Sequence, residues 1–157
     1  MSKLVGFFDG AYLWEDGHAA YGCVVKRDRE VIYTDHGYLG ASRARLSVNC
    51  AEYAGLISIL KFLISIDADE AEIFGDSKLV VYQMARKWKA KDGIYLSHYV
   101  EAAQLRNKLP RVTFRWIPRE QNGEADALSK IPLQSFYGDY KYNHMDAEFA
   151  RAIEAED

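Results

Sequence analysis

The N-terminal stretch LVGFFDGAYLWEDG, residues 4–17, opens the pattern that sets the fold class. Its apolar run Leu4–Phe8 predicts a β-strand, and Glu15–Gly17 is a turn signal because Asp-Gly is a strong turn dipeptide. Two further segments rich in valine, isoleucine and tyrosine follow at Tyr21–Lys26 and Val31–Leu39. Three such segments joined by tight polar turns predict an antiparallel meander.

The period of the hydrophobic pattern then changes from that of strands to that of helices. In Val48–Ile66 the apolar residues Leu56, Ile59, Leu60 and Leu63 recur at the spacing of an amphipathic helix. Five further elements are predicted beyond it: a strand at Glu70–Gly75, helices at Ser77–Trp88 and Tyr95–Lys108, a strand at Val112–Ile117 and a helix at Asn122–Ile131. The order βββαβααβα predicts an α/β fold with a five-stranded mixed sheet flanked by helices.

Composition and charge limit the classes of protein to which this chain can belong. The chain has 157 residues, 49% of them hydrophobic, which is typical of one packed domain. The N-terminus has no cationic segment before a long apolar run, and the apolar stretches fall short of the ~20 residues that cross a bilayer. We therefore expect no signal peptide, no membrane partner and a cytoplasmic location, with Cys23 and Cys50 as buried free thiols. The net charge of −3 argues weakly against a nucleic-acid binder, but acids gathered around metal ions would also make the chain acidic.

The last part of the chain differs in composition from the rest. We assign residues 1–131 to one domain and residues 132–157 to a C-terminal extension, because Pro132 stops the last predicted helix. Met145, Phe149 and Ile153 recur at four-residue spacing, which predicts a short terminal helix with one apolar face. A frayed tail is the alternative.

Two carboxylates stand out on apolar elements. Asp9 follows the first strand and is either a turn residue or a carboxylate within an apolar element, where it must be paired, protonated or bound to metal. Glu52 precedes Leu56 by four residues and so shares the apolar face of its helix. The alternative for Glu52 is a first-turn acid favoured by the helix dipole.

Two more carboxylates lie at the ends of predicted elements. Asp76 lies where a strand gives way to a helix, and it is either the N-cap or a ligand-binding acid at the carboxyl end of a strand, with Ser77 as the cap. Asp126 lies in the first turns of the last helix, where an acid also compensates the helix dipole behind Asn122. Taken singly, each of these acids has an ordinary structural explanation.

Taken together, the segments that carry these acids resemble type 1 ribonuclease H. The matching pieces occur in the family's order: FFDGA (7–11), NCAEYAGL (49–56), FGDSKLV (74–80) and REQNGEADALS (119–129). The resemblance implies the ribonuclease H-like fold and an endonuclease that hydrolyses the RNA strand of RNA–DNA hybrids, leaving 5′-phosphate and 3′-hydroxyl ends.

The resemblance also implies a metal site. Asp9, Glu52, Asp76 and Asp126 would hold two Mg²⁺ ions, with Mn²⁺ as a substitute, and Asp9 would bridge both. Glu52 and Asp76 would bind one ion and Asp126 the other. Hard cations take oxygen ligands, and two such ions can activate water and steady the leaving oxygen of a phosphodiester displacement.

Substrate contacts follow from the same resemblance. Asn49, Ser77, Lys78 and Asn122 would contact the hybrid, and the backbone at Gly10, Ala11 and Tyr12 would face the RNA 2′-hydroxyls. Trp88 and Lys89 would line the channel for the DNA strand. The alternative for each is an ordinary polar surface residue, and for the basic run around Trp88 a solvated helix end.

The sequence departs from the family in two places. Residues 91–93 lead directly into the next helix, so the basic protrusion that many members carry is absent. No histidine precedes Asp126 in residues 117–126, and Arg119, Glu120, Glu124 or His144 could take its place. Three alternatives stay open: a nuclease acting on RNA–RNA duplexes, a non-catalytic hybrid-binding module, and a domain of a larger polyprotein such as a reverse transcriptase. The methionine start favours a free-standing protein, and we expect a monomer.

Overall fold

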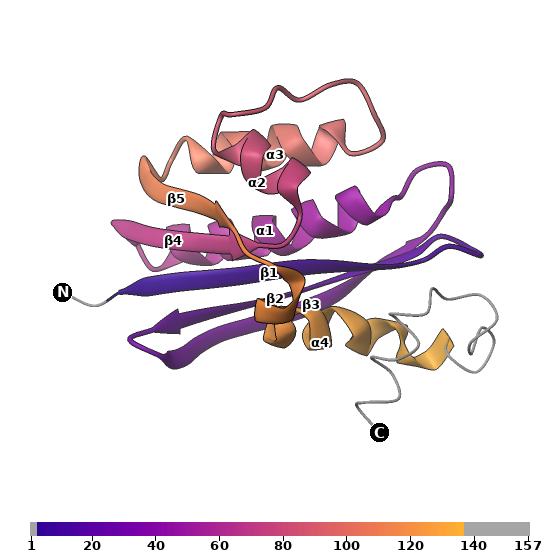
Figure 1. The fold of residues 1–157 in the computed structure, drawn as a ribbon, viewed down its shortest axis with the longest axis horizontal. Coiled ribbons are helices and arrows are strands. Elements are labelled where there is room, and N and C mark those ends of the chain that lie inside the picture. Colours follow the sequence, from indigo (N-terminus) through magenta and orange to yellow (C-terminus); the bar gives the residue numbers. More distant parts are fainter. Residues whose placement is uncertain (1–2, 137–157) are drawn as a thin grey trace.

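A computed structural model describes residues 3–136 of the chain as a five-stranded sheet flanked by helices (Figure 1). The strands stand in the spatial order β3-β2-β1-β4-β5. Their bounds are β1 (Leu4–Leu13), β2 (His18–Arg27), β3 (Glu30–Ala41), β4 (Glu70–Gly75) and β5 (Arg111–Trp116). β1, β2 and β3 pair antiparallel, whereas β4 and β5 run parallel to β1. The mixed α/β sheet predicted from the sequence is therefore confirmed.

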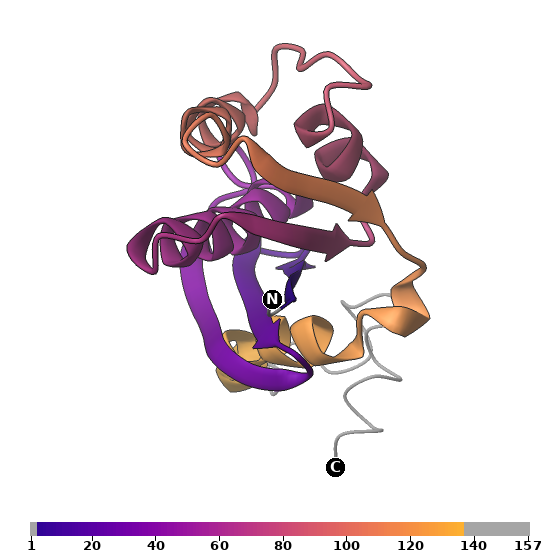
Figure 2. The same cartoon turned by 90° about the vertical axis from the view of Figure 1, so that its left-hand side faces the viewer.

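Helices cover both faces of this sheet. The helices are α1 (Val48–Ser65), α2 (Lys78–Met84), α3 (Leu96–Arg106) and α4 (Gly123–Lys130), with short 3₁₀ helices η1 (Arg119–Gln121) and η2 (Ile131–Phe136). Figure 2 shows α4 on one side of the sheet and the other three on the opposite side. The main core lies under α1, where Phe8, Leu56, Ile59, Leu60 and Ile73 are fully buried.

The first strand is longer than the sequence predicted. It was expected to end at Phe8, but it continues to Leu13 because residues 9–13 pair one by one with residues 18–22 of β2. The hairpin turns at residues 14–17, where Gly17 takes a positive φ of 73° and its N–H donates to the Leu13 carbonyl. Asp9 is thus a residue of the strand interior, and the alternative that it forms a turn is wrong.

Helix α1 is the central element of the core. Ser47 caps its amino end by accepting a hydrogen bond from the Cys50 N–H. Among the described residues, α1 alone is long and apolar enough to cross a membrane by length and composition, with a mean hydropathy of 1.3. Most of it, 61%, is buried within the domain, as is usual for a core helix. Cys23 and Cys50 are both buried and free, as predicted.

Helix α2 is shorter than the sequence predicted. It was expected to reach Trp88, but it ends at Met84. Arg86 takes a positive φ of 64°, and the N–H groups of Lys87 and Trp88 both donate to the Tyr82 carbonyl. The chain therefore leaves the helix one turn early, and Trp88 stands on an irregular segment.

The chain continues past Pro132 in contact with the domain. η2 buries Leu133 against Ala11, Leu13 and Ala20, and the Phe136 ring stacks on His18 with centroids 3.8 Å apart. Division of the chain at residue 131 stays a prediction. The expected terminal helix through Met145, Phe149 and Ile153 lies outside the described residues.

Candidate active site

Asp9 lies at the centre of the site, in the middle of the central strand β1. It pairs with Gly22 of β2, and its side chain is only 4% exposed. Its Oδ1 accepts a hydrogen bond of 2.9 Å from the Gly10 N–H. An acid buried in a sheet needs further partners, because an isolated buried carboxylate is costly.

Two glycines allow helices to approach Asp9 from both faces of the sheet. A Cβ on Gly10 would lie 2.5 Å from the backbone nitrogen of Glu52, so the start of α1 rests directly on this strand. A Cβ on Gly22 would lie 2.7 Å from the Ala125 carbonyl oxygen, so α4 rests equally closely on the neighbouring strand. These contacts bring α1 and α4 to the same strand pair that carries Asp9.

Glu52 projects from the buried face of α1 and is 5% exposed. It lies beyond the first turn of the helix, which contains no acid. The alternative of a first-turn acid that compensates the helix dipole is therefore wrong. Its Oε2 is buried and has no hydrogen-bond partner among residues 3–136.

Asp76 lies between β4 and α2 and does not cap the helix. Ser77 is the N-cap, and its hydroxyl accepts a 3.2 Å hydrogen bond from the Val80 N–H. The Asp76 carboxylate instead accepts a 3.0 Å hydrogen bond from the Asn122 side-chain amide. The same amide donates to the Phe8 carbonyl at 2.8 Å, so Asn122 ties Asp76 to β1.

Asp126 enters the site from α4 together with a lysine that the sequence analysis missed. The Nζ of Lys130 lies 2.7 Å from Asp126 Oδ2, and Lys130 is only 2% exposed. Its signal in the sequence was the four-residue spacing from Asp126, which places both on one helix face. Ser129 donates to the Asp126 carbonyl at 2.6 Å and stiffens the same turn.

Ligand oxygens of Asp9, Glu52 and Asp76 all lie within 4.8 Å of one another. Burial raises the pKa of Asp9 well above its usual range, and the charges of Asp76 and Asp126 raise it further. Burial likewise raises the pKa of Glu52, with added repulsion from Asp9 and Asp76. Four separate elements thus hold their acids together against mutual repulsion.

This arrangement fits a divalent cation. Hard cations prefer carboxylate oxygens, and a positive ion would relieve the repulsion that raises both pKa values. It would also give the partnerless Glu52 Oε2 an interaction that residues 3–136 do not provide. The donor set is therefore the one expected of a Mg²⁺ or Mn²⁺ site.

The structure distributes the predicted substrate contacts around the acids. Asn49 lies in the first turn of α1, and the Tyr12 hydroxyl donates to the Leu46 carbonyl at 3.1 Å. Ala11 is buried under η2, so only its backbone is available for a contact. Asn122 is 1% exposed and lies among the acids, which excludes its alternative as a surface residue.

The predicted contacts on and after α2 are more exposed. Lys78 begins α2 and places its Nζ 4.9 Å from the centre of the Trp116 ring. Trp88 and Lys89 are exposed beyond the end of α2, where the Trp88 ring meets Tyr82 edge-on with centroids 5.0 Å apart. No contact of Trp88 or Lys89 with the acid cluster is present in the described part of the chain.

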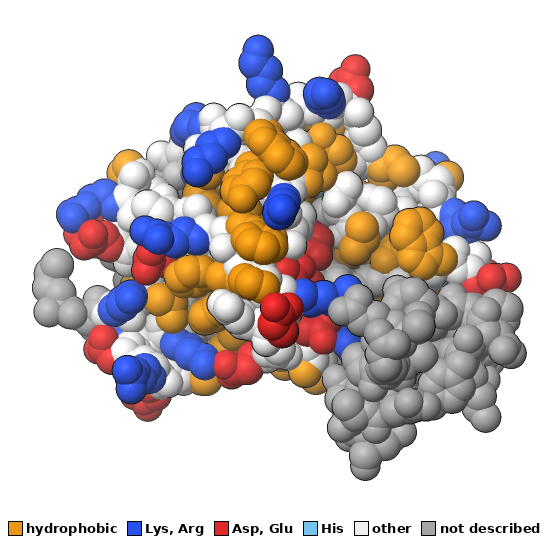
Figure 3. All heavy atoms as spheres, viewed as in Figure 1, with side chains coloured by type: hydrophobic (Ala, Val, Ile, Leu, Met, Phe, Trp, Pro, Cys, Tyr) orange, Lys and Arg blue, Asp and Glu red, His pale blue; other side chains and the backbone are white. Residues whose placement is uncertain are grey.

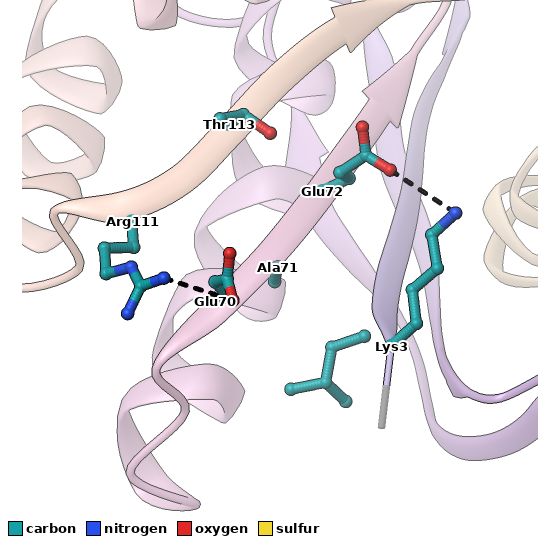
Figure 4. Close-up of a pocket in the computed structure, with 7 residues that line it drawn as sticks. Lys3, Glu70, Ala71, Glu72, Arg111 and Thr113 are labelled. Atoms are coloured by element: carbon teal, nitrogen blue, oxygen red, sulfur yellow. Dashed lines mark ion pairs between the residues drawn. The ribbon is translucent and has the colours of Figure 1, made fainter. Parts of the chain in front are cut away.

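A separate hollow of about 410 Å³ lies at the opposite, amino ends of β4 and β5 (Figure 4). Its charged residues pair with one another: Lys3 with Glu72 at 3.7 Å and Arg111 with Glu70 at 3.3 Å. Exposed pairs of this kind are ordinary surface features. The hollow therefore lacks the concentrated like charge that marks the acid cluster.

Known proteins share this fold and these segments. The family model described as "Reverse transcriptase-like" matches residues 7–131. A curated relative, the bifunctional protein Rv2228c of Mycobacterium tuberculosis, is 37% identical over 137 residues, which are 85% of this chain and 36% of that protein. The ribonuclease HI of Halobacterium salinarum is 32% identical over 132 residues, 83% of this chain and 64% of that protein. The chain thus spans about a third of the length of Rv2228c.

Solved structures agree with the sequence matches. The N-terminal RNase H domain of Rv2228c superposes with a TM-score of 0.78 at 33% identity, covering 88% of this chain and 99% of that one. The RNase H1 of H. salinarum gives a TM-score of 0.74 at 28% identity, with coverages of 85% and 98%. LC11-RNase H1, solved in complex with an RNA/DNA hybrid, gives 0.72 at 28% identity, with coverages of 80% and 93%.

Proposed function

This chain belongs to the reverse transcriptase-like family and shares its fold with type 1 RNase H domains, and from that premise we propose that it is a ribonuclease H that hydrolyses the RNA strand of RNA–DNA hybrids with two divalent metal ions. The observation that carries the proposal is the convergence of four acids from β1, α1, the end of β4 and α4. A structural role alone would not gather four like charges and bury two of them, Asp9 and Glu52, since their repulsion destabilises the fold.

Each acid has its own part in the proposed reaction. Asp9 interacts with the acids of both α1 and α4 and would contact both ions. Glu52 and Asp76 would complete one ion's ligands, and Asp126 would bind the other. When bound, two such ions supply an activated water and neutralise the leaving oxygen of an in-line displacement, which gives 5′-phosphate and 3′-hydroxyl ends.

Neighbouring side chains orient these acids. Asn122 holds the Asp76 carboxylate against β1 through its two donated hydrogen bonds. Lys130 holds Asp126 and offsets part of the cluster's charge. Because both residues are almost fully buried, their geometry is set before substrate binds.

The proposed substrate is a hybrid whose RNA strand crosses the acid cluster. The complex of LC11-RNase H1 with an RNA/DNA hybrid supports this for a relative. On this chain, Asn49, Ser77 and Lys78 at the starts of α1 and α2 would contact the duplex, and the backbone of residues 10–12 would meet the 2′-hydroxyls that distinguish RNA from DNA. Trp88 and Lys89 would face the DNA strand. Action as a monomer and a cytoplasmic location stay predictions.

A cleavage assay on three labelled duplexes tests the proposal. RNA–DNA, RNA–RNA and DNA–DNA duplexes of one sequence are incubated with Mg²⁺, with Mn²⁺ or with EDTA. We expect cleavage of the RNA strand of the hybrid alone, with either ion and not with EDTA. Equal cleavage of the RNA–RNA duplex, or hybrid binding without cleavage under any metal condition, would contradict it.

A further inference from the structure

A second surface adjoins the acid cluster and has a different chemistry. A groove of about 470 Å³ lies between α2 and β5, lined by Tyr82, Lys87, Thr113, Phe114, Arg115 and Trp116. No acid of residues 3–136 lines it, and three of its six residues are aromatic. Figure 3 shows hydrophobic side chains and Lys or Arg side chains mixed over this part of the face, directly beside acidic ones.

Rings of this groove already contact cations in it or beside it. Lys78 lies 4.9 Å from the Trp116 ring centre, and Lys87 lies 5.7 Å from that of Tyr82. Trp116 is 37% exposed, although burying an indole ring is favourable. Exposed rings among cations are the combination that binds single-stranded nucleic acid, because bases stack on the rings and phosphates lie near the cations.

The groove is continuous with the acid cluster. The Trp116 indole N–H donates to the Asp76 carbonyl at 3.0 Å. The Ile117 N–H donates to the Gly75 carbonyl at 3.0 Å, so β5 is fixed to the end of β4 where Asp76 begins. Trp116 therefore lies beside Asp76, where a strand bound at the acid cluster would reach the groove.

We propose that this groove binds an unpaired RNA segment that continues from the strand being cut. The cut strand is the RNA strand, and it is the one that lies at Asp76, so this inference rests on the proposed function. The segment must be unpaired, because bases within a duplex stack on one another and leave no face for Trp116. The groove is thus an addition to the duplex contacts at α1 and α2.

Binding measurements in EDTA separate the groove from cleavage. Fluorescence anisotropy compares a blunt hybrid with the same hybrid carrying a short single-stranded extension on its RNA strand or its DNA strand, tried at each end. We expect an RNA extension at one end to tighten binding about tenfold, the effect of one base stacking on one ring. The DNA extensions should give little gain.

Variants locate the gain in the groove. Trp116→Leu should abolish the gain from the RNA extension, whereas Trp116→Phe keeps a ring and should retain most of it. Arg115→Ala should reduce the gain severalfold. Arg111→Ala is the matched control, since Arg111 lies at the other end of β5 and, like Arg115, pairs with an acid. It should leave the gain unchanged.

The outcomes distinguish the two proposals. No gain from any RNA extension, an equal gain from DNA extensions, or a full gain in Trp116→Leu would each overturn the groove assignment. Failure to bind the blunt hybrid would count against the proposed function instead. The groove is then still tested by single-stranded RNA alone, which should bind the wild type more tightly than Trp116→Leu.

Discussion

At the amino ends of β4 and β5, charged side chains pair with one another in the open, whereas at the carboxyl ends acids are gathered and buried. Arg111 contacts both Asp69 and Glu70 at the first end, and all three are exposed. At the second end, Asp9 and Glu52 are almost fully buried beside Asp76. Charge is thus balanced at the amino ends of β4 and β5, whereas acids from β1, α1 and the end of β4 are concentrated at the opposite edge. Concentrated charge is costly and therefore points to a ligand, while balanced charge does not.

The strongest test of this contrast removes the central acid. Asp9→Asn should reduce hybrid cleavage to background, because the acid proposed to contact both ions loses its charge. Hybrid binding in EDTA should survive, since the proposed duplex contacts are made by residues other than Asp9. Near-normal turnover in Asp9→Asn would contradict the assignment of the metal site.

The buried lysine provides the next largest effect. Lys130→Met leaves Asp126 without its cation, and loss of one partner of a buried pair costs about 3 kcal/mol of unfolding free energy. Thermal or urea unfolding in EDTA measures it, and Lys130→Arg should recover most of the loss. Because a metal ion would replace the missing charge, Mg²⁺ should stabilise Lys130→Met more than the wild type. An equal gain from Mg²⁺ in both would show that Lys130 does not act through the site.

Removal of the buried amide should have a smaller effect on stability. Asn122→Ala deprives the Phe8 carbonyl and the Asp76 carboxylate of a donor, which should cost about 1–3 kcal/mol. Turnover should fall as well, because Asp76 loses its orientation. Loss of stability without any change in the Mg²⁺ concentration needed for half-maximal turnover would limit Asn122 to a structural role.

The raised pKa values of Asp9 and Glu52 predict an unusual pH dependence without metal. Both pKa values are higher in the folded chain than in the unfolded one, so the folded state binds more protons. The contribution of Asp9 and Glu52 to the unfolding free energy in EDTA should therefore be most favourable below about pH 4. It should be lost as the pH rises through their raised pKa values. The decline should be shallower in Asp9→Asn and unchanged in Glu70→Gln, an acid from the opposite end. A wild-type stability that rises over this range in EDTA, with no difference in Asp9→Asn, would contradict the raised values.

The smallest effect is expected at the amino ends of β4 and β5, where the charged side chains pair with one another. Arg111→Ala breaks two exposed ion pairs, each worth about 0–1 kcal/mol. Unfolding free energy should change by less than about 1 kcal/mol, and cleavage should not change. A substantial loss of cleavage would show that the two ends of the strands are coupled.

Much of the fold could be predicted from the order of hydrophobic periods. β4 was predicted with its observed bounds, and α1 to within one residue of its end. The continuation of β1 past Phe8 could not be predicted, because Asp-Gly is ambiguous between a turn and a strand until the partner strand is known. The early end of α2 depends on the positive φ of Arg86, a position where an arginine gives no signal in the sequence.

The candidate site shows a similar division. The four acids could be selected from the sequence because their segments resemble a known family, and the structure brings them together. Lys130 could not be selected from the sequence, because an acid and a lysine four residues apart usually form an exposed pair on a helix. Its burial results from the close docking of α4 on Gly22, a contact between residues far apart in the chain. Trp116 was likewise an unremarked member of an alternating strand.

During synthesis on a ribosome, the acid cluster is incomplete until nearly all of the described chain has been made. Asp9 emerges early, but Asp126 follows more than a hundred residues later, on a helix that must then dock against β2. A nascent chain that has formed only β1, β2 and β3 carries one of the four acids. Under the proposed function, a nascent chain without Asp126 should not cut nucleic acid near its own site of synthesis. Activity should appear only once α4 has docked and has brought Asp126 to the other three acids.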